Sequence, residues 1–158
     1  MNATSPLHLT SYVAGEAIES ENLLEVFNPY NGEPVGTVTM ASPADAERAM
    51  AAAVEPVESQ TRYQRSQVLL AARDALLKET ESFAQLIMSE SGLCMRETRY
   101  EVGRASDVLQ FAAMEALRDD GQIFSCDVSP QGKQRKIFTT REPVRLALAI
   151  TPFNHPLN

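Results

Sequence analysis

Several residue types are scarce in this 158-residue sequence, and their scarcity excludes some classes of protein. The two cysteines, Cys94 and Cys126, lie far apart without metal-binding or redox spacing, which excludes a disulfide-rich scaffold and suits a reducing compartment. Basic residues number 14 against 21 acidic ones, and the net charge of −7 argues against a nucleic-acid or anionic-membrane partner. No apolar run has transmembrane length, and the N-terminus lacks signal-peptide order. We therefore expect a cytoplasmic protein.

The remaining composition is that of an ordinary globular domain. Hydrophobic residues make up 44% and charged residues 22% of the chain, which is unlike a disordered tail. A chain of this length can bury one core.

The first part of the chain indicates small strands and then a helix. Residues 1–10 carry little pattern and are expected to form a loose terminus. Residues 12–18 predict a small hairpin, and residues 26–38 predict two strands joined by a turn at Asn31-Gly32. The segment Ser42-Pro43-Ala44-Asp45 predicts a helix start, because serine can cap a helix, proline suits its first position and Asp45 meets the positive end of the dipole.

Three more helices are expected. Thr61 and Gln64 have capping-box spacing before a helix that runs to about Lys78, and a second helix ends at Gly92. The third runs from about Arg96 to Gly121 and carries two apolar stripes, which predicts packing on more than one side. The stripes are Val102, Ala105, Leu109, Ala112 and Ala116, and Tyr100, Arg104, Val108 and Phe111.

The last part of the chain predicts a hairpin and then a buried strand. Residues 123–128 and 133–140 predict a long two-stranded ribbon, which must lie on another structure to be stable. The run from Val144 to Ile150 lies between two prolines and is typical of a strand buried on both faces of a parallel sheet. Ligands bind beyond the carboxyl ends of such strands, which makes residues 151–155 the candidate site.

The segment R-E-P-V-R-L-A-L-A-I-T-P-F-N-H-P, residues 141–156, resembles the first core segment of NAD(P)-dependent aldehyde dehydrogenases. Glu90-Ser91-Gly92 and Tyr100-Glu101-Val102 are similar to an upstream segment of the same family. Three longer runs, residues 100–108, 118–127 and 136–143, resemble the phosphonoacetaldehyde dehydrogenases of that family. The resemblance extends from about Glu25 to the last residue.

The resemblance implies an α/β fold with a Rossmann-like domain that binds NAD or NADP. Residues 1–121 match the N-terminal part of that domain, 122–142 a β-hairpin arm that joins subunits of a homodimer or homotetramer, and 143–158 the first core strand with its oxyanion loop. Members of the family are much longer, and this sequence lacks their lysine-bearing strand, glycine-containing cofactor loop and nucleophilic cysteine. An N-terminal fragment is therefore expected.

The resemblance also implies roles for single residues. Asn154 matches the amide that donates to the oxyanion, although by itself it would be a turn former after proline. Arg104 and His155 match residues of the family's phosphonate pocket, and the forked donors of a guanidinium suit that anion. Without the resemblance, Arg104 would be a surface charge and His155 a structural histidine, since His155 has no partners for a metal site. A further set matches the wall beside the cofactor's ribose and nicotinamide, or else forms a hydrophobic plug: Ile150, Thr151, Pro152 and Phe153.

The resemblance implies that the enzyme oxidises a small anionic aldehyde. The expected reaction converts phosphonoacetaldehyde to phosphonoacetate. The family's reaction adds a thiolate to the aldehyde, transfers hydride to the nicotinamide and hydrolyses the acyl-enzyme. Two alternatives stay open: a dehydrogenase for lactaldehyde or a phosphorylated aldehyde, and an inactive truncated chain that binds full-length subunits through its β-arm.

We expect no dehydrogenase activity from the 158-residue chain alone. Neither Cys94 nor Cys126 has an adjacent base, and neither stands where the family keeps its nucleophile, so the covalent step has no thiolate. The chain would be mixed with phosphonoacetaldehyde and NAD, and the absorbance of reduced cofactor followed. Turnover above the protein-free blank that is lost on Cys94→Ser or Cys126→Ser substitution would contradict this expectation.

Overall fold

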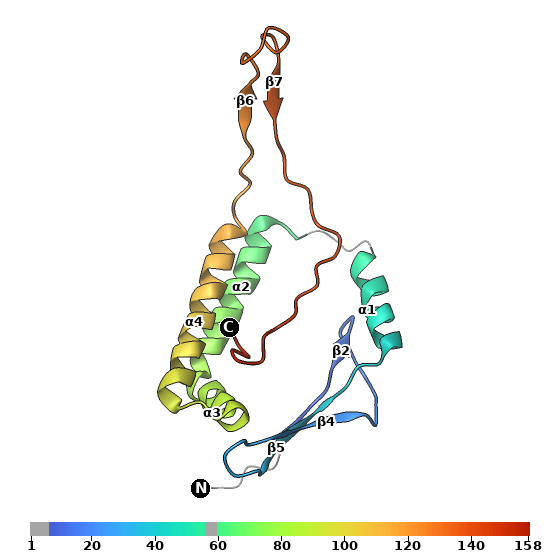
Figure 1. Ribbon diagram of the computed structural model, residues 1–158, viewed down its shortest axis with the longest axis vertical. Helices are drawn as coiled ribbons and strands as arrows, with labels where there is room; N and C mark the ends of the chain where they lie inside the picture. The colour runs from blue at the N-terminus through green and yellow to red at the C-terminus, as the bar shows by residue number, and fades with distance from the viewer. Residues whose placement is uncertain (1–6, 56–59) are drawn as a thin grey trace.

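The computed structural model describes residues 7–55 and 60–158, a mixed α/β arrangement in which strands come first, helices follow and a hairpin comes last (Figure 1). The strands of the first part are β1 (Leu7–Leu9), β2 (Tyr12–Val13), β3 (Glu16–Ala17), β4 (Leu23–Phe27) and β5 (Pro34–Thr39). The helices are α1 (Pro43–Val54), α2 (Arg62–Lys78), α3 (Thr80–Ser91) and α4 (Met95–Glu115). Strands β6 (Ile123–Ser125) and β7 (Lys136–Phe138) complete the described chain.

A three-stranded sheet with the order β1-β5-β4 forms the base of the molecule (Figure 1). Strands β4 and β5 are antiparallel, as predicted from the Asn31-Gly32 turn, where Gly32 has a φ of 71°. Strand β1 runs parallel to β5, so the expectation of a loose terminus is wrong for Leu7–Leu9; residues 1–6 lie outside the described part. The partner of β1 is distant in sequence, and local pattern does not reveal it. The carbonyl oxygen of Leu7 lies so close to Gly36 that a Cβ atom on residue 36 would collide with it.

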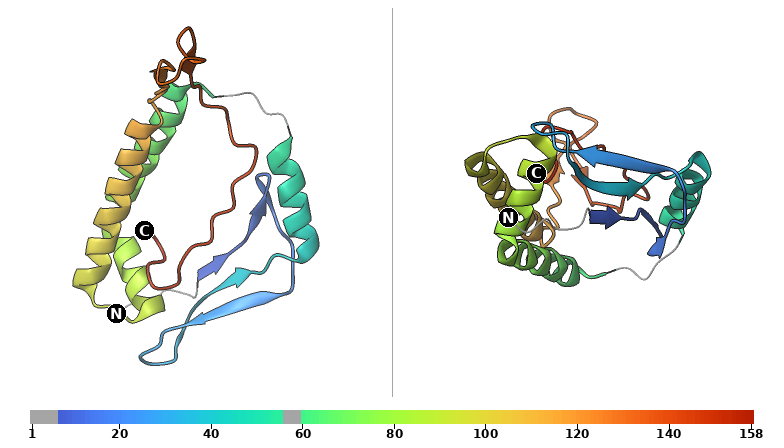
Figure 2. Two further views of the ribbon diagram at one scale, coloured as in Figure 1. Left: turned by 45° about the horizontal axis from the view of Figure 1, so that its top comes forward. Right: turned by 90° about the horizontal axis from the view of Figure 1, so that it is seen from below.

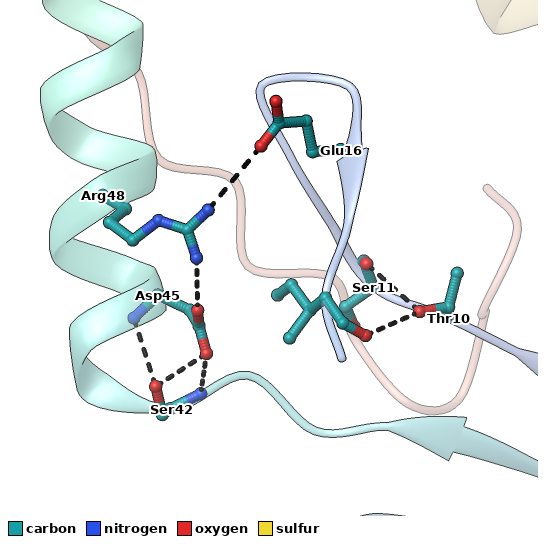
Figure 3. Close-up of polar contacts among 7 residues, drawn as sticks. Thr10, Ser11, Glu16, Ser42, Asp45 and Arg48 are labelled. Carbon is teal, nitrogen blue, oxygen red and sulfur yellow. Dashed lines mark hydrogen bonds and ion pairs between the residues drawn. The ribbon is translucent and has the colours of Figure 1, made fainter. Parts of the chain in front are cut away.

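The small hairpin and the helix start are confirmed (Figure 3). Strands β2 and β3 pair as antiparallel neighbours. Ser42 Oγ accepts a hydrogen bond from the Asp45 amide at 3.2 Å, and Asp45 Oδ2 accepts one from the Ser42 amide at 2.9 Å. The hydrogen bonds from Ser42 lower the pKa of Asp45. Arg48 pairs with Asp45 at 2.9 Å and reaches Glu16 at 4.0 Å, which links α1 to the hairpin.

Helices α2, α3 and α4 pack into one layer on the other side of the molecule from α1 (Figure 1). Thr61 and Gln64 form the predicted capping box, with hydrogen bonds of 2.8 and 3.2 Å. Helix α3 ends at Ser91, and Gly92, the predicted stop, follows it in the left-handed conformation. The buried core of this layer consists of Leu76, Ala84, Ile87, Val102 and Ala105.

Helix α4 differs from the prediction in two ways. It ends at Glu115 rather than Gly121. Continuing it would put the charges of Asp119 and Asp120 at the negative end of the helix dipole. Only one of its stripes is buried: Tyr100 is 68% and Phe111 66% exposed, and no described element covers that side. The prediction of packing on more than one side is therefore wrong for the described chain.

Strands β6 and β7 confirm the predicted hairpin, but with a shorter ladder. Three residue pairs form it, from Ile123 opposite Phe138 to Ser125 opposite Lys136. The hairpin projects away from the helices, so the described residues give its strands nothing to lie on (Figures 1 and 2).

The predicted core strand from Val144 to Ile150 does not form. The segment has no strand pairing and bends at Arg145, and Leu148 and Ile150 are 86% and 85% exposed. A strand buried in a parallel sheet needs hydrogen-bonded neighbours, and the described part of the chain supplies none at this place. The segment instead passes between α1 and the helical layer, and the chain ends beside α4, where the Leu157 amide donates a hydrogen bond to Glu101 (Figures 1 and 2).

No helix within residues 7–55 and 60–158 is long and apolar enough to cross a membrane.

The two capping boxes predict different effects on stability. Thr61→Ala should lower the free energy of unfolding by about 1 kcal/mol, because α2 is packed against α4 and its end is part of the cooperative fold. For a chain of this size the melting temperature would fall by about 2–4 °C. Ser42→Ala is the matched control: α1 has no buried residue, so helicity should fall with little change in the melt. Circular dichroism melts check both, and equal melting shifts would contradict the prediction.

Candidate functional site

A pocket lies where α4 meets the C-terminal segment. Its volume is about 330 Å³, within the range of small-molecule sites. The residues that line it are Leu93, Glu97, Tyr100, Glu101, Arg104 and His155. Five of them come from α4 or the turn before it, and His155 comes from the last residues of the chain.

The helix brings its residues to one face by spacing alone. Glu97, Glu101 and Arg104 stand at positions i, i+4 and i+7, with Tyr100 between them at i+3. The adjoining face of α4, through residues such as Val102 and Ala105, packs against α2 and α3, and Glu101 stands at the border between the two faces. The core packing of α4 therefore fixes the direction in which the pocket residues project.

Glu101 is the buried member of the pocket, with only 3% of its surface exposed. Its Oε1 accepts a hydrogen bond from the Leu157 amide at 2.9 Å. Its Oε2 is buried and has no hydrogen-bond partner within the described chain. The Nδ1 atom of His155 lies 3.7 Å from Oε2, which is an ion-pair distance but too long for a hydrogen bond.

Arg104 supplies a cation without a carboxylate partner among the residues that the structure describes. Its Cζ atom lies 6.0 Å from the centroid of the Tyr100 ring, at the outer limit of a cation–π contact. The guanidinium is exposed toward the pocket side of α4 and keeps its fork of N–H donors for a ligand.

The model of the aldehyde dehydrogenase family matches residues 16–158. This chain belongs to the aldehyde dehydrogenase family. The family resemblance of the sequence is thereby confirmed, and the family is one of NAD(P)-dependent enzymes.

Three relatives illustrate the match. The 3-sulfolactaldehyde dehydrogenase of Priestia aryabhattai is 37% identical over 148 residues, which cover 93% of this chain and 31% of that protein. The NADP-dependent glyceraldehyde-3-phosphate dehydrogenase of Bacillus halodurans C-125, complexed with NADP, superposes with a TM-score of 0.83 at 27% identity over 96% of this chain and 33% of that one. A betaine aldehyde dehydrogenase of Staphylococcus aureus in complex with NAD+ gives a TM-score of 0.66 at 28% identity over 75% and 25%.

The chain therefore spans a third or less of the length of these aldehyde dehydrogenases. By name they act on different aldehydes, and one solved complex contains NADP and the other NAD+. The narrower resemblance to phosphonoacetaldehyde dehydrogenases finds no support among them and stays a prediction.

The structure brings two of the predicted site residues of this aldehyde dehydrogenase chain together. Arg104 and His155 are far apart in sequence and line the same pocket. The Arg104 side chain itself is exposed. Asn154 lies in an exposed turn and does not line this pocket. The predicted cofactor wall, residues 150–153, is exposed as well.

Sequence reasoning missed Glu101 as a site residue. The signal was present: Glu101 falls at helical spacing among Thr98, Val102 and Ala105, all of which are buried. A glutamate inside a buried stripe is rare unless it has a partner, so its position alone points to a specific interaction.

The other described parts of the chain contain weaker candidates for a functional site. Cys94 is exposed and Cys126 partly buried, and neither lines the pocket. Within residues 7–55 and 60–158 no group of three histidine, cysteine or acidic side chains could hold a metal ion. Burial raises the pKa of Glu90, which lies beside a narrow apolar groove between α3 and the strands β1, β4 and β5.

Proposed function

We propose that this chain is part of an NAD(P)-dependent dehydrogenase for a small anionic aldehyde, whose anionic group is held by Arg104 and His155. The observation that supports this is the pocket itself, in which an arginine without a carboxylate partner faces a histidine. Phosphonoacetaldehyde is the first candidate, on the sequence runs that resemble its dehydrogenases. The name of the sulfolactaldehyde relative points to the same chemistry, since a sulfonate is also a tetrahedral oxyanion.

The charges of the pocket decide how an anion would be held. Glu97 and Glu101 also line it, so two carboxylates stand against one guanidinium and the pocket has no net positive charge, even with His155 protonated. Binding must therefore come from direct hydrogen bonds, and a guanidinium can give two parallel ones to a phosphonate or carboxylate. The Coulomb attraction between the guanidinium and the anion then strengthens these hydrogen bonds, whose geometry already selects the ligand.

Asn154 would act on the other end of the substrate. It directly precedes His155, so an anion held at His155 puts an aldehyde carbonyl one or two carbons away near the Asn154 side chain. Its amide can donate a hydrogen bond to the oxyanion that forms when a thiolate adds to the carbonyl. Loss of such a donor typically costs about 3–4 kcal/mol of transition-state stabilisation.

The cofactor would lie against residues 150–153. Ile150 is 85% and Phe153 95% exposed, and these uncovered apolar side chains suit one face of a flat ring. Thr151 and Pro152 complete that wall. When bound, the nicotinamide supplies the hydride acceptor; the wall holds it and excludes water. NAD and NADP are both compatible with the relatives.

The proposal divides the chain into residues 1–121 and 143–158, which belong to the cofactor domain, and residues 122–142, which form an arm between subunits of a homo-oligomer. The hairpin's Ile123 and Phe138 are 80% and 75% exposed, which supports a partner surface there. The same observation favours the second candidate, a chain that acts only by binding longer subunits through this arm.

The proposal predicts a change of specificity in a full-length enzyme that carries this sequence. Arg104→Ala should lower kcat/KM for phosphonoacetaldehyde by about ten- to a hundred-fold, the loss of one charged hydrogen bond, and leave propionaldehyde nearly unchanged. Arg104→Lys keeps the charge without the fork and should fall between. Steady-state kinetics on both aldehydes measure this.

Asn154→Ala is the control with the opposite pattern, because the oxyanion is common to all aldehydes. It should depress turnover of charged and uncharged substrates alike. If Arg104→Ala also slowed both aldehydes equally, Arg104 would be a structural residue and the anionic substrate would lose its support.

A further inference from the structure

The proposed function does not use the most buried polar group of the pocket, the Glu101 carboxylate. A buried carboxylate oxygen without a partner is costly, and Oε2 of Glu101 is in that position. The other oxygen is occupied by the Leu157 amide. A group that completes this carboxylate would therefore stabilise the pocket.

A candidate donor for Oε2 is His155, which lies within ion-pair distance of it. Its Nδ1 lies 3.7 Å from Oε2, about 0.8 Å beyond an ordinary hydrogen bond. The other charged or titratable groups of the pocket are Glu97, Tyr100 and Arg104 on the same helix. None of them bonds to Glu101 in the described chain, and Glu97 has no proton to give when ionised. Hydrogen bonds at such sites are often long without a ligand and shorten with one.

We propose that Glu101 is a positioning residue for the anion site, an inference that rests on the proposed function. Its Oε2 accepts the Nδ1–H of His155 and so turns Nε2 toward the pocket. With a second proton on Nε2, the imidazolium donates to an oxyanion held by Arg104, while the buried carboxylate stabilises the positive ring. Its Oε1 fixes the backbone at Leu157, two residues further on.

Two simpler roles give different results. If Glu101 only accepted the hydrogen bond of the Leu157 amide, Glu101→Gln would bind the anion as tightly as the unmodified chain, because the amide oxygen of glutamine still accepts that hydrogen bond. If Glu101 only contributed negative charge, its removal would tighten anion binding by Coulomb's law. Positioning of His155 predicts the reverse: removal of the charge weakens anion binding although the pocket becomes less negative.

The test compares Glu101→Gln with Glu97→Gln, which removes the same charge from the exposed wall of the same pocket. The ¹⁵N shifts of the histidine rings in labelled chain report which nitrogen carries the proton, and a His155→Gln variant separates His155 from His8. The shifts are recorded at a pH where the ring is neutral. Binding of phosphonoacetate is measured by calorimetry, and circular dichroism shows that each variant retains its helices.

The expected result is an Nδ1-protonated His155 in the unmodified chain and in Glu97→Gln, and loss of that preference in Glu101→Gln. Phosphonoacetate should bind about tenfold more weakly to Glu101→Gln, and as tightly or more tightly to Glu97→Gln. A His155 tautomer that does not depend on Glu101, or unchanged affinity in Glu101→Gln, would overturn the inference. If the unmodified chain does not bind phosphonoacetate while the tautomer still depends on Glu101, the positioning role stands and the anionic substrate falls.

Discussion

Helix α4 is packed along one face against α2 and α3, and the arrangement of the pocket depends on that packing. Val102 and Ala105 lie in the buried core, so the rotation of the helix about its axis is fixed. This orientation of the helix leaves Arg104 on the pocket side and places the buried Glu101 next to the last residues of the chain. One hydrogen bond, from the Leu157 amide to Glu101, then attaches the C-terminal segment and brings His155 to the helix.

Around this fixed part, much apolar surface is left uncovered by the described chain. The exposed side of α4, the β6–β7 hairpin and residues 144–153 all present large hydrophobic side chains. Monomeric proteins rarely expose so much, because covering it removes apolar surface from water. The match to about a third of longer aldehyde dehydrogenases offers a physical reason: an apolar segment that is expected to form a strand of a parallel sheet needs neighbours that residues 7–55 and 60–158 do not supply.

Local signals predicted local structure well. The caps at Ser42 and Thr61, the end of α3 at Gly92 and the turn at Asn31-Gly32 are confirmed, since each depends on residues within one turn. Predictions that needed a distant partner did worse. The pairing of β1 was missed and the strand at 144–150 does not form, because both depend on which segments lie beside them.

The site shows the same division. The family resemblance selected Arg104 and His155, and the structure places them at one pocket, although their roles stay proposals. Glu101 was overlooked because a charged residue on a helix is usually solvated. Only its place in the buried stripe beside Val102 distinguished it.

The most direct measurement for the central claim, that this pocket binds a small anion, is a titration of ¹⁵N-labelled chain with phosphonoacetate, followed in amide and arginine side-chain spectra. The account predicts saturable shift changes at Arg104 Nε and at the backbone of residues 100–105 and 155–157, with the hairpin unaffected. Shift changes confined to other parts of the chain, or none at saturating ligand, would contradict it.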